Sequence, residues 1–408
     1  MTYRTGAGLM LALAWLPLSA HAQEGDPPPE EAPKTVPETA PDIVTVDGQF
    51  SQFLSTVAAG NGEGETRYGG RIDLYAKIDG GAAGIVDGLT INAQGEFIYG
   101  NSVNRVGSRT LLPVNTAMNF PVNDDEAFDL SVNIVQRIGK VRVQLGKINL
   151  LDSSSAIPIV AGGGKVGFQH IGLAAPPGLI ASPKIFGGIV TVPAGRVVIS
   201  AGVWHPEDWT REFIDGGLFG NGVSGMVAGT LPAKIGGKQG FHTVTIFATS
   251  RKPSAEGLPD IRPPEGSAPL LSGDRGGTHL RYAVQHYLWQ DPSDPKRGFG
   301  LFGHAGISIG APALLDWSMT AGLAGSVPIA ARPRDRFGIG YFRFSLEDRI
   351  ADGLAPVLPV GDEQGGEIYY AAQLGDMLQL TASAQLVDPV LANAPDAVNF
   401  NLRAVVAF

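Results

Sequence analysis

Charged and amide side chains recur at every second position in many short stretches of this sequence. Guanidinium and amide groups donate hydrogen bonds and carboxylates accept them, so such a surface can bind water or a polar solute. A face this polar cannot be a dry core, because burying unpaired polar groups costs several kcal/mol each (~2–7). The candidate residues are Arg71, Asp73, Lys77, Asn92, Gln94, Glu96, Arg142, Gln144, Arg281, Glu367, Gln379, Gln385, Asn399 and Arg403.

Other chemistries have weaker support. The chain contains no cysteine, which excludes disulfides and thiolate metal or redox sites. The histidines form no i, i+4 pair beside a glutamate, so the zinc motif of metalloproteases is absent. Residues 220–225 fit G-x-G-x-x-G, but no helical pattern follows them. The sequence therefore predicts no catalytic residue, no metal site and no cofactor.

The candidate polar residues lie in stretches that alternate with period two, as β-strands do. In Leu89–Phe97 the even positions are polar and the odd positions are apolar or small. The same alternation occurs at Arg71–Asp79, Phe128–Asn133, Lys140–Leu145, Leu315–Leu323, Gly366–Leu374, Leu378–Leu386 and Val398–Phe408. We therefore expect an all-β protein in which one face of each strand is polar.

The connections between these segments alternate between short and long, as in barrels whose strands run up and down between two rims. A weaker segment at Phe50–Val57 brings the count to about sixteen strands, an even number. The last segment alternates as far as Phe408, so we expect it to pair with the first and close an antiparallel transmembrane β-barrel. Closure leaves no unpaired strand edge in lipid.

The N-terminal residues predict export. Arg4, an apolar run and Ala20-His21-Ala22 follow the order of a secretory signal peptide, so we expect 1–22 to be removed. Residues 23–46 are rich in proline and acids and predict a disordered tether, which leaves 47–408 as the barrel domain. The formal net charge of −9 disfavours nucleic-acid binding.

Two long connections are candidates to fold into the lumen and narrow it. The connection 100–126 contains Arg105, Arg109 and Asn115, and the connection 150–184 contains Asp152 and Lys165. Either could instead be an exposed surface loop. The tryptophans Trp204, Trp209, Trp289 and Trp317 lie near predicted strands or their ends, and we expect most of them at the membrane boundaries.

Several separated blocks resemble the OprB-type carbohydrate-selective porins. They are Gly146–Asp152, Leu111–Thr116 with Phe120–Pro121, Gln285–Pro292, Arg297–Gly303, Phe337–Tyr341 and Gly366–Tyr370, within a similarity that runs from about residue 67 to Phe408. The resemblance implies an outer-membrane barrel of about sixteen strands that passes monosaccharides, glucose above all, passively into the periplasm. It also implies a constriction lined by arginines and acids.

The resemblance makes small sugars the expected permeants. Their hydroxyls accept from arginine and donate to carboxylates. Other expected partners are outer-membrane lipid and the barrel-assembly machinery, through the strand that ends at Phe408.

Two alternatives stay open. One is a general diffusion porin without sugar preference. The other is an outer-membrane lipase, because Asn221–Ser224 with His205 or His242 is similar to the Asn-Gly-x-Ser portion of outer-membrane phospholipases. The basic and aromatic stretch that follows the serine in that family is missing here.

Overall fold

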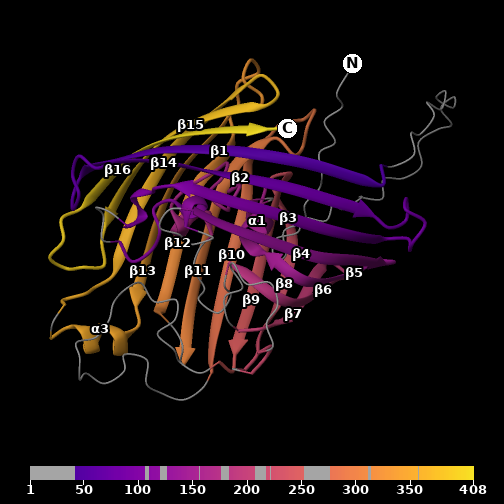
Figure 1. Cartoon of the computed structure of the whole chain (residues 1–408), viewed down its shortest axis with the longest axis horizontal. Coiled ribbons are helices and arrows are strands. Elements are labelled where there is room, and N and C mark those ends of the chain that lie inside the picture. The colour runs from indigo at the N-terminus through magenta and orange to yellow at the C-terminus, as the bar shows by residue number, and fades with distance from the viewer. Residues whose placement is uncertain are drawn as a thin grey trace.

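The computed structural model describes residues 42–105, 110–119, 126–155, 157–175, 183–206, 217–220, 222–251, 276–310, 314–356 and 358–408. The described residues form one closed antiparallel barrel of 16 strands (Figure 1). No helix in these ranges is long and apolar enough to cross a membrane. The predicted signal peptide, 1–22, and nearly all of the predicted tether, 23–46, lie outside the described residues.

The strands are β1 Val44–Ala59, β2 Thr66–Asp79, β3 Leu89–Gly100, β4 Glu126–Ile138, β5 Val141–Asn149, β6 Lys184–Ala194, β7 Val197–Trp204, β8 Ser224–Ile235, β9 Lys238–Thr249, β10 Gly277–Gln290, β11 Gly298–Gly310, β12 Leu315–Ser326, β13 Arg336–Leu346, β14 Glu363–Leu374, β15 Leu378–Asp388 and β16 Ala397–Ala407. The short helices are η1 Val103–Arg105, η2 Thr116–Met118, α1 Leu150–Ser155, α2 Ile171–Ala174 and α3 Asp348–Leu354. The weak first strand is real and begins at Val44, so it includes the last residues of the predicted tether.

The barrel closes between its first and last strands, as the alternation of the last segment predicts. β1 pairs with β16 from Gln49 opposite Ala407 onward, and Figure 1 shows indigo β1 beside yellow β16. Gly48 N donates to Phe408 O at 2.8 Å and Phe408 N donates to Gly48 O at 2.9 Å. A Cβ at Gly48 would lie 2.4 Å from the Phe408 ring, so a larger residue at this position would displace the aromatic side chain.

The two faces of the barrel sort their side chains as expected. Leu74, Leu380 and Leu402 point outward and are 50%, 41% and 57% exposed, whereas Gln94 and Arg403 are buried. Ile91 is half-buried on the outer face. Hydrocarbon would surround such an outer surface at little cost, because apolar side chains need no hydrogen bonds there.

Aromatic residues gather on the outer surface near the short turns. Trp289 stacks on Phe299 at 6.0 Å between ring centroids, and Phe299 contacts Phe337 at 5.7 Å. At the opposite end of the strands Trp317 lies under the guanidinium of Arg343 at 5.6 Å. Trp204 differs from the expected girdle position, because it is buried against Phe247, Met226 and Ile189. Trp209 lies outside the described residues.

The outward position of Leu402 can be tested with a charge. Leu402→Arg should destabilise the folded barrel in lipid by about 2–4 kcal/mol, since an arginine there would lie in hydrocarbon. Ile235→Arg is the matched control: Ile235 is 60% exposed but ends β8 beside a short turn, so its cost should be under about 1 kcal/mol. Denaturant unfolding in lipid vesicles measures both, and equal costs would contradict the assigned orientation.

Candidate functional site

Two long connections fold into the lumen. The described parts of the first are residues 101–105 and 110–119, and those of the second are 150–155 and 157–175; we call them the first and second inner loops. The loops contact each other: Thr116 N donates to Gln169 O at 2.9 Å and Ile171 N donates to Pro113 O at 3.1 Å. Both connections proposed as constrictions therefore enter the barrel and interlock.

Carboxylates of β14 hold the backbone of both loops. Glu363 accepts from the amides of Leu111 and Leu112, and Glu367 accepts from Gln169 N and His170 N at 2.9 Å each. These bonds join residues about two hundred positions or more apart in sequence. These bonds satisfy loop amides that would otherwise be buried without a partner.

Arginines and glutamines of neighbouring strands hold the loop carbonyls and amides. Arg403 donates to Gly164 O at 2.9 Å and to Gly167 O at 3.0 Å. Arg336 donates to Ile159 O at 2.9 Å, and Gln285 accepts from Ile159 N at 3.1 Å. The second inner loop is therefore attached to β10, β13, β14 and β16.

An apolar patch completes this attachment and differs from the uniformly polar inner wall that alternation predicts. Phe168 of the second inner loop contacts Tyr369 at 4.9 Å and Phe302 at 5.5 Å between ring centroids. Gly338 and Gly340 make room for the loop, because a Cβ at either would lie 2.7 Å from Phe168 or Leu173. This part of the inner wall is a dry core beneath a loop.

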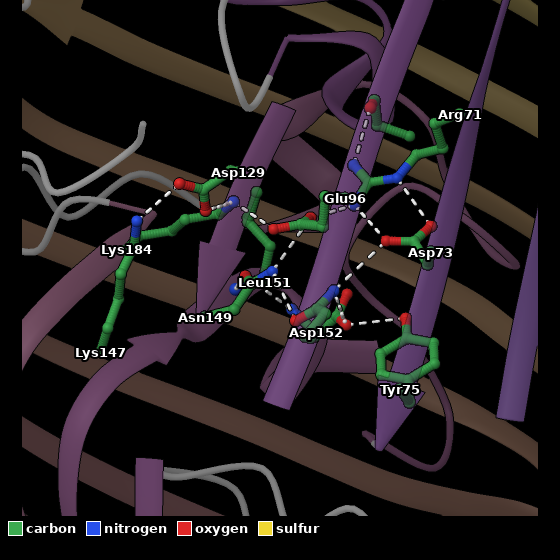
Figure 2. Close-up of polar contacts among 12 residues, drawn as sticks. Arg71, Asp73, Tyr75, Glu96, Asp129, Lys147, Asn149, Leu151, Asp152 and Lys184 are labelled. Carbon is green, nitrogen blue, oxygen red and sulfur yellow. Dashed lines mark hydrogen bonds and ion pairs between the residues drawn. The ribbon is translucent and has the colours of Figure 1, made fainter. Parts of the chain in front are cut away.

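The opposite wall carries a buried charged network that includes part of the second inner loop (Figure 2). Four cations alternate with four carboxylates: Arg71, Lys147, Lys165 and Lys184 with Asp73, Glu96, Asp129 and Asp152. These groups come from β2 to β6 and from residues 152 and 165 of the loop. Their formal charges cancel, so the buried network as a whole carries no net charge.

Arg71 is the centre of one half of the network. Its Nε donates to Asp73 Oδ2 at 2.8 Å, and its Nη2 contacts Glu96. Its Nη1 donates to Ala117 O of the first inner loop at 2.9 Å. A planar guanidinium supplies this forked set of donors, which a lysine cannot reproduce.

Asp152 carries the network into the second inner loop. Tyr75 Oη donates to Asp152 Oδ2 at 2.8 Å and Gln94 Nε2 donates to the same oxygen at 2.6 Å. Lys165 pairs with Asp152 and donates to Tyr75 Oη at 2.7 Å. The loop therefore adds one carboxylate and one cation to the network, and the charge balance is kept.

The other half of the network joins β3, β4, β5 and β6. Lys184 contacts both Glu96 and Asp129, and Lys147 Nζ lies 2.5 Å from Asp129 Oδ1. Asn149 Nδ2 donates to Glu96 Oε1 at 3.2 Å. Asp129 therefore bridges two lysines from neighbouring strands.

The remaining candidates lie at other places. Arg142, Gln144 and Asn92 form a separate polar row with Asn133. The hydrogen bonds are 2.8 Å from Arg142 to Gln144, 2.9 Å from Gln144 to Asn133 and 3.2 Å from Asn92 to Asn133.

The other candidates are not part of this row. Lys77 is exposed, and Asn115 caps η2 by accepting from Met118 N. Gln385 donates to Val114 O, whereas Gln379 and Asn399 face inward on β15 and β16. Arg281 lies on β10. The backbone of Arg105 ends η1, but its side chain and all of Arg109 lie outside the described residues.

Sequence reasoning missed Asp129, Lys147, Asn149, Lys184 and Glu363. Asp129 lies within the expected strand Phe128–Asn133 and could have been found by its parity. Lys147 and Asn149 could not have been found in this way. They are an odd number of positions from the inward-facing Gln144, so strict alternation places them on the outer face. The backbone at Gly146 has φ of +125°, a conformation that L-residues rarely adopt, and the alternation of burial stops there.

Comparisons with known proteins agree with this architecture. Residues 243–408 match the family model described as carbohydrate-selective porin, OprB family. The resemblance to this family is confirmed over these residues, and the blocks at 111–121 and 146–152 lie outside the match. No curated protein sequence matches the chain.

Solved structures show the same fold. The high-pH structure of OprB from Pseudomonas putida is similar with a TM-score of 0.71 and 15% identity, over 90% of this chain and 94% of that one. The low-pH structure of the same protein has a TM-score of 0.50 and 13% identity, over 90% and 92%. OpdK of Pseudomonas aeruginosa with vanillate has a TM-score of 0.50 and 8% identity, over 90% and 98%.

The OprB-type blocks inside the matched range are largely structural. Arg297 contacts Asp291 and donates to Val327 O and Pro333 O at 2.9 Å each, so it joins the β10–β11 and β12–β13 turns. Tyr370 Oη donates to Asp335 Oδ2 at 2.5 Å in the second of these turns. Similarity to the family at these positions therefore reflects the structure of the barrel's rim and does not identify the permeant.

Neither a metal site nor the lipase alternative gains support from the described residues. In that part of the chain no three histidines or acids gather to hold a metal ion. Ser224 Oγ donates to Thr249 Oγ1 at 2.8 Å, and the ring of His242 bonds Tyr282 Oη. His205 Nδ1 accepts from Phe219 N at 2.8 Å. These contacts show no serine–histidine pair.

The network predicts a large effect for Asp129. Asp129→Asn removes the carboxylate that two buried lysines share, so the free energy of unfolding should fall by about 3–5 kcal/mol. Asp376→Asn, in an exposed pair with Arg334, is the control and should have almost no effect. Unfolding of the reconstituted proteins measures the difference, and equal stability of the two variants would count against the network.

His170 predicts a pH dependence of loop docking. Its ring stacks on Phe342 at 3.9 Å, and burial lowers the pKa of His170 to about 3. The unfolded imidazole titrates near 6.5, so below that pH the unfolded state binds the extra proton and stability falls with decreasing pH.

Between pH 6.5 and 4.5 this residue should therefore cost about 2–3 kcal/mol. His170→Asn keeps a side-chain acceptor for Gly172 N but does not titrate. Unfolding measured across this pH range should show a steeper fall for the wild type than for the variant, and parallel curves would refute the assignment.

Proposed function

We propose that this protein is an outer-membrane channel that lets monosaccharides such as glucose diffuse passively into the periplasm. The observation that carries the proposal is the pair of inner loops that cross the lumen and meet a charge-balanced polar wall. The match of residues 243–408 to a carbohydrate-selective family supports the same permeant class. We assign it no enzymatic reaction.

The balanced network favours neutral, hydroxylated solutes in this proposal. Diameter, hydrogen-bonding groups and fixed charge set the selectivity of a pore. A wall with equal numbers of cations and carboxylates offers donors and acceptors without attracting ions of either sign. A sugar can exchange its water for polar side chains of the wall that are not fully buried, such as Lys77, Asn92 and Arg142, while an ion gains little in return for its hydration.

The proposal includes a route to the membrane. Residues 1–22 serve as a cleaved export signal and the proline-rich residues from 23 onward as a tether in the periplasm, ahead of the barrel that begins with β1 at Val44. The last strand and Phe408 are recognised by the barrel-assembly machinery. The rim with the long connections then faces the outside of the cell, as in other bacterial barrels.

Liposome swelling tests the selectivity. Vesicles that contain the protein should swell faster in glucose than in a neutral amino acid of similar size, because sugar hydroxyls match the wall. Equal rates for glucose, amino acids and small ions would favour the general diffusion porin instead.

Arg403→Ala tests the role of the inner loops in the same assay. Loss of the bonds to Gly164 and Gly167 should release the second inner loop, raise conductance and reduce the preference for glucose. Arg334→Ala, in an exposed turn, is the control and should change neither. Unchanged conductance in the Arg403 variant would show that this loop does not restrict the passage.

A further inference from the structure

A second polar cluster lies on the wall away from the charged network. It consists of Thr245 on β9, His279 and Arg281 on β10, His304 on β11 and Thr320 on β12, and we call it the imidazole cluster. Register places Thr245 opposite Arg281 and His304 opposite Thr320, with Arg281 opposite Gly306. All five side chains are buried.

Gly306 is the reason that the two imidazoles approach each other. A Cβ at Gly306 would lie 2.7 Å from His279 Nε2 and 3.4 Å from His304 Nε2. The two rings therefore cover the same glycine. Arg281 lies beside them, with its guanidinium 5.3 Å from the centroid of the Phe247 ring.

Several polar atoms of this cluster have no hydrogen-bond partner in the described part of the chain. They are His279 Nε2, both ring nitrogens of His304, Thr245 Oγ1 and Thr320 Oγ1. Buried polar groups are normally satisfied, so a group of them on one face indicates a bound solute or water. Hydroxyl groups and neutral imidazoles can each donate and accept, which is the pattern that sugar hydroxyls require.

The charge of the surrounding wall differs from that of the network. Strands β6 to β11 contain no aspartate or glutamate, whereas they contribute Arg281 beside the imidazoles. The opposite wall supplies Asp73, Glu96 and Asp129. A solute with a negative charge therefore meets no carboxylate on β9, β10 or β11, and the acid on β12, Asp316, lies at the start of that strand, four positions before Thr320.

The cluster also lies on the entry side of the second inner loop. Arg281 is near the start of β10, which follows a long connection, while Gln285 further along the same strand holds Ile159 of that loop. A solute that enters from the rim with long connections therefore reaches the imidazole cluster before the level at which the loop is attached.

We propose that the imidazole cluster binds sugar acids, with the carboxylate at Arg281 and the hydroxyls at the imidazoles and threonines. This inference rests on the proposed function and names a second permeant class for the same lumen. Arginine suits the role because its fork matches a carboxylate in two parallel hydrogen bonds.

Glucuronate and glucose are the matched probes, since they differ only in a carboxylate at the terminal carbon. Uptake of each labelled solute is measured in proteoliposomes whose membrane potential is clamped by potassium and valinomycin. The wild type should take up both. Arg281→Gln should lower glucuronate uptake by about tenfold, the scale of one charge-assisted hydrogen bond, and change glucose uptake less than about twofold.

Further variants separate binding from structure. Arg281→Lys should restore part of the glucuronate uptake, and His304→Leu should lower it without the loss of charge. Arg196→Gln removes a cation from the exposed β6–β7 turn, and His286→Leu removes an imidazole from the outer face of β10; both should behave as the wild type. A difference in gel migration between heated and unheated samples confirms that each variant is folded.

The outcomes are distinct. A wild type that takes up glucose but excludes glucuronate overturns the sugar-acid site and leaves the proposed function intact. Equal loss of both solutes in folded Arg281→Gln shows a structural role and also overturns it. A wild type that takes up neither solute contradicts the proposed function itself.

Discussion

Backbone N–H and C=O groups cannot form hydrogen bonds with hydrocarbon. The closed sheet and the sorting of side chains between its two faces follow from that constraint. A sheet in lipid must close, so β1 must meet β16. Closure leaves one face of each strand to lipid and encloses the other. Polar side chains then gather in the interior, where there is room for loops, water and solutes.

The two inner loops use the interior in different ways on opposite walls. On β13 to β16 they are attached by carboxylates, arginines and an apolar patch around Phe168. Towards β2 to β6 they contribute Asp152 and Lys165 to a network of paired charges. Both attachments combine polar and apolar contacts, since Met118 of the first inner loop also packs against Phe53 and Ile98 beside the charged network.

The sequence predicts the barrel well because alternation is local and strong. Period two assigns Leu74 and Leu402 to the outer face and Gln94 and Arg403 to the interior, and the structure agrees. It fails beside Gly146, where a positive φ interrupts the pattern and Lys147 becomes buried. The position of the loops is harder still, because Glu363 and Glu367 hold backbone amides, and amides carry no residue-specific signal.

The order of the chain sets the order in which the lumen can fill. The inner loops end by residue 175, but the side chains that hold them at Gln285, Arg336, Glu363, Glu367 and Arg403 come later in the sequence. The loops can contact Tyr75 and Gln94 of the earlier strands first, but their attachment to β10, β13, β14 and β16 requires strands that come later in the chain. The attachment of the second inner loop is complete only when Arg403 of the last strand is in place.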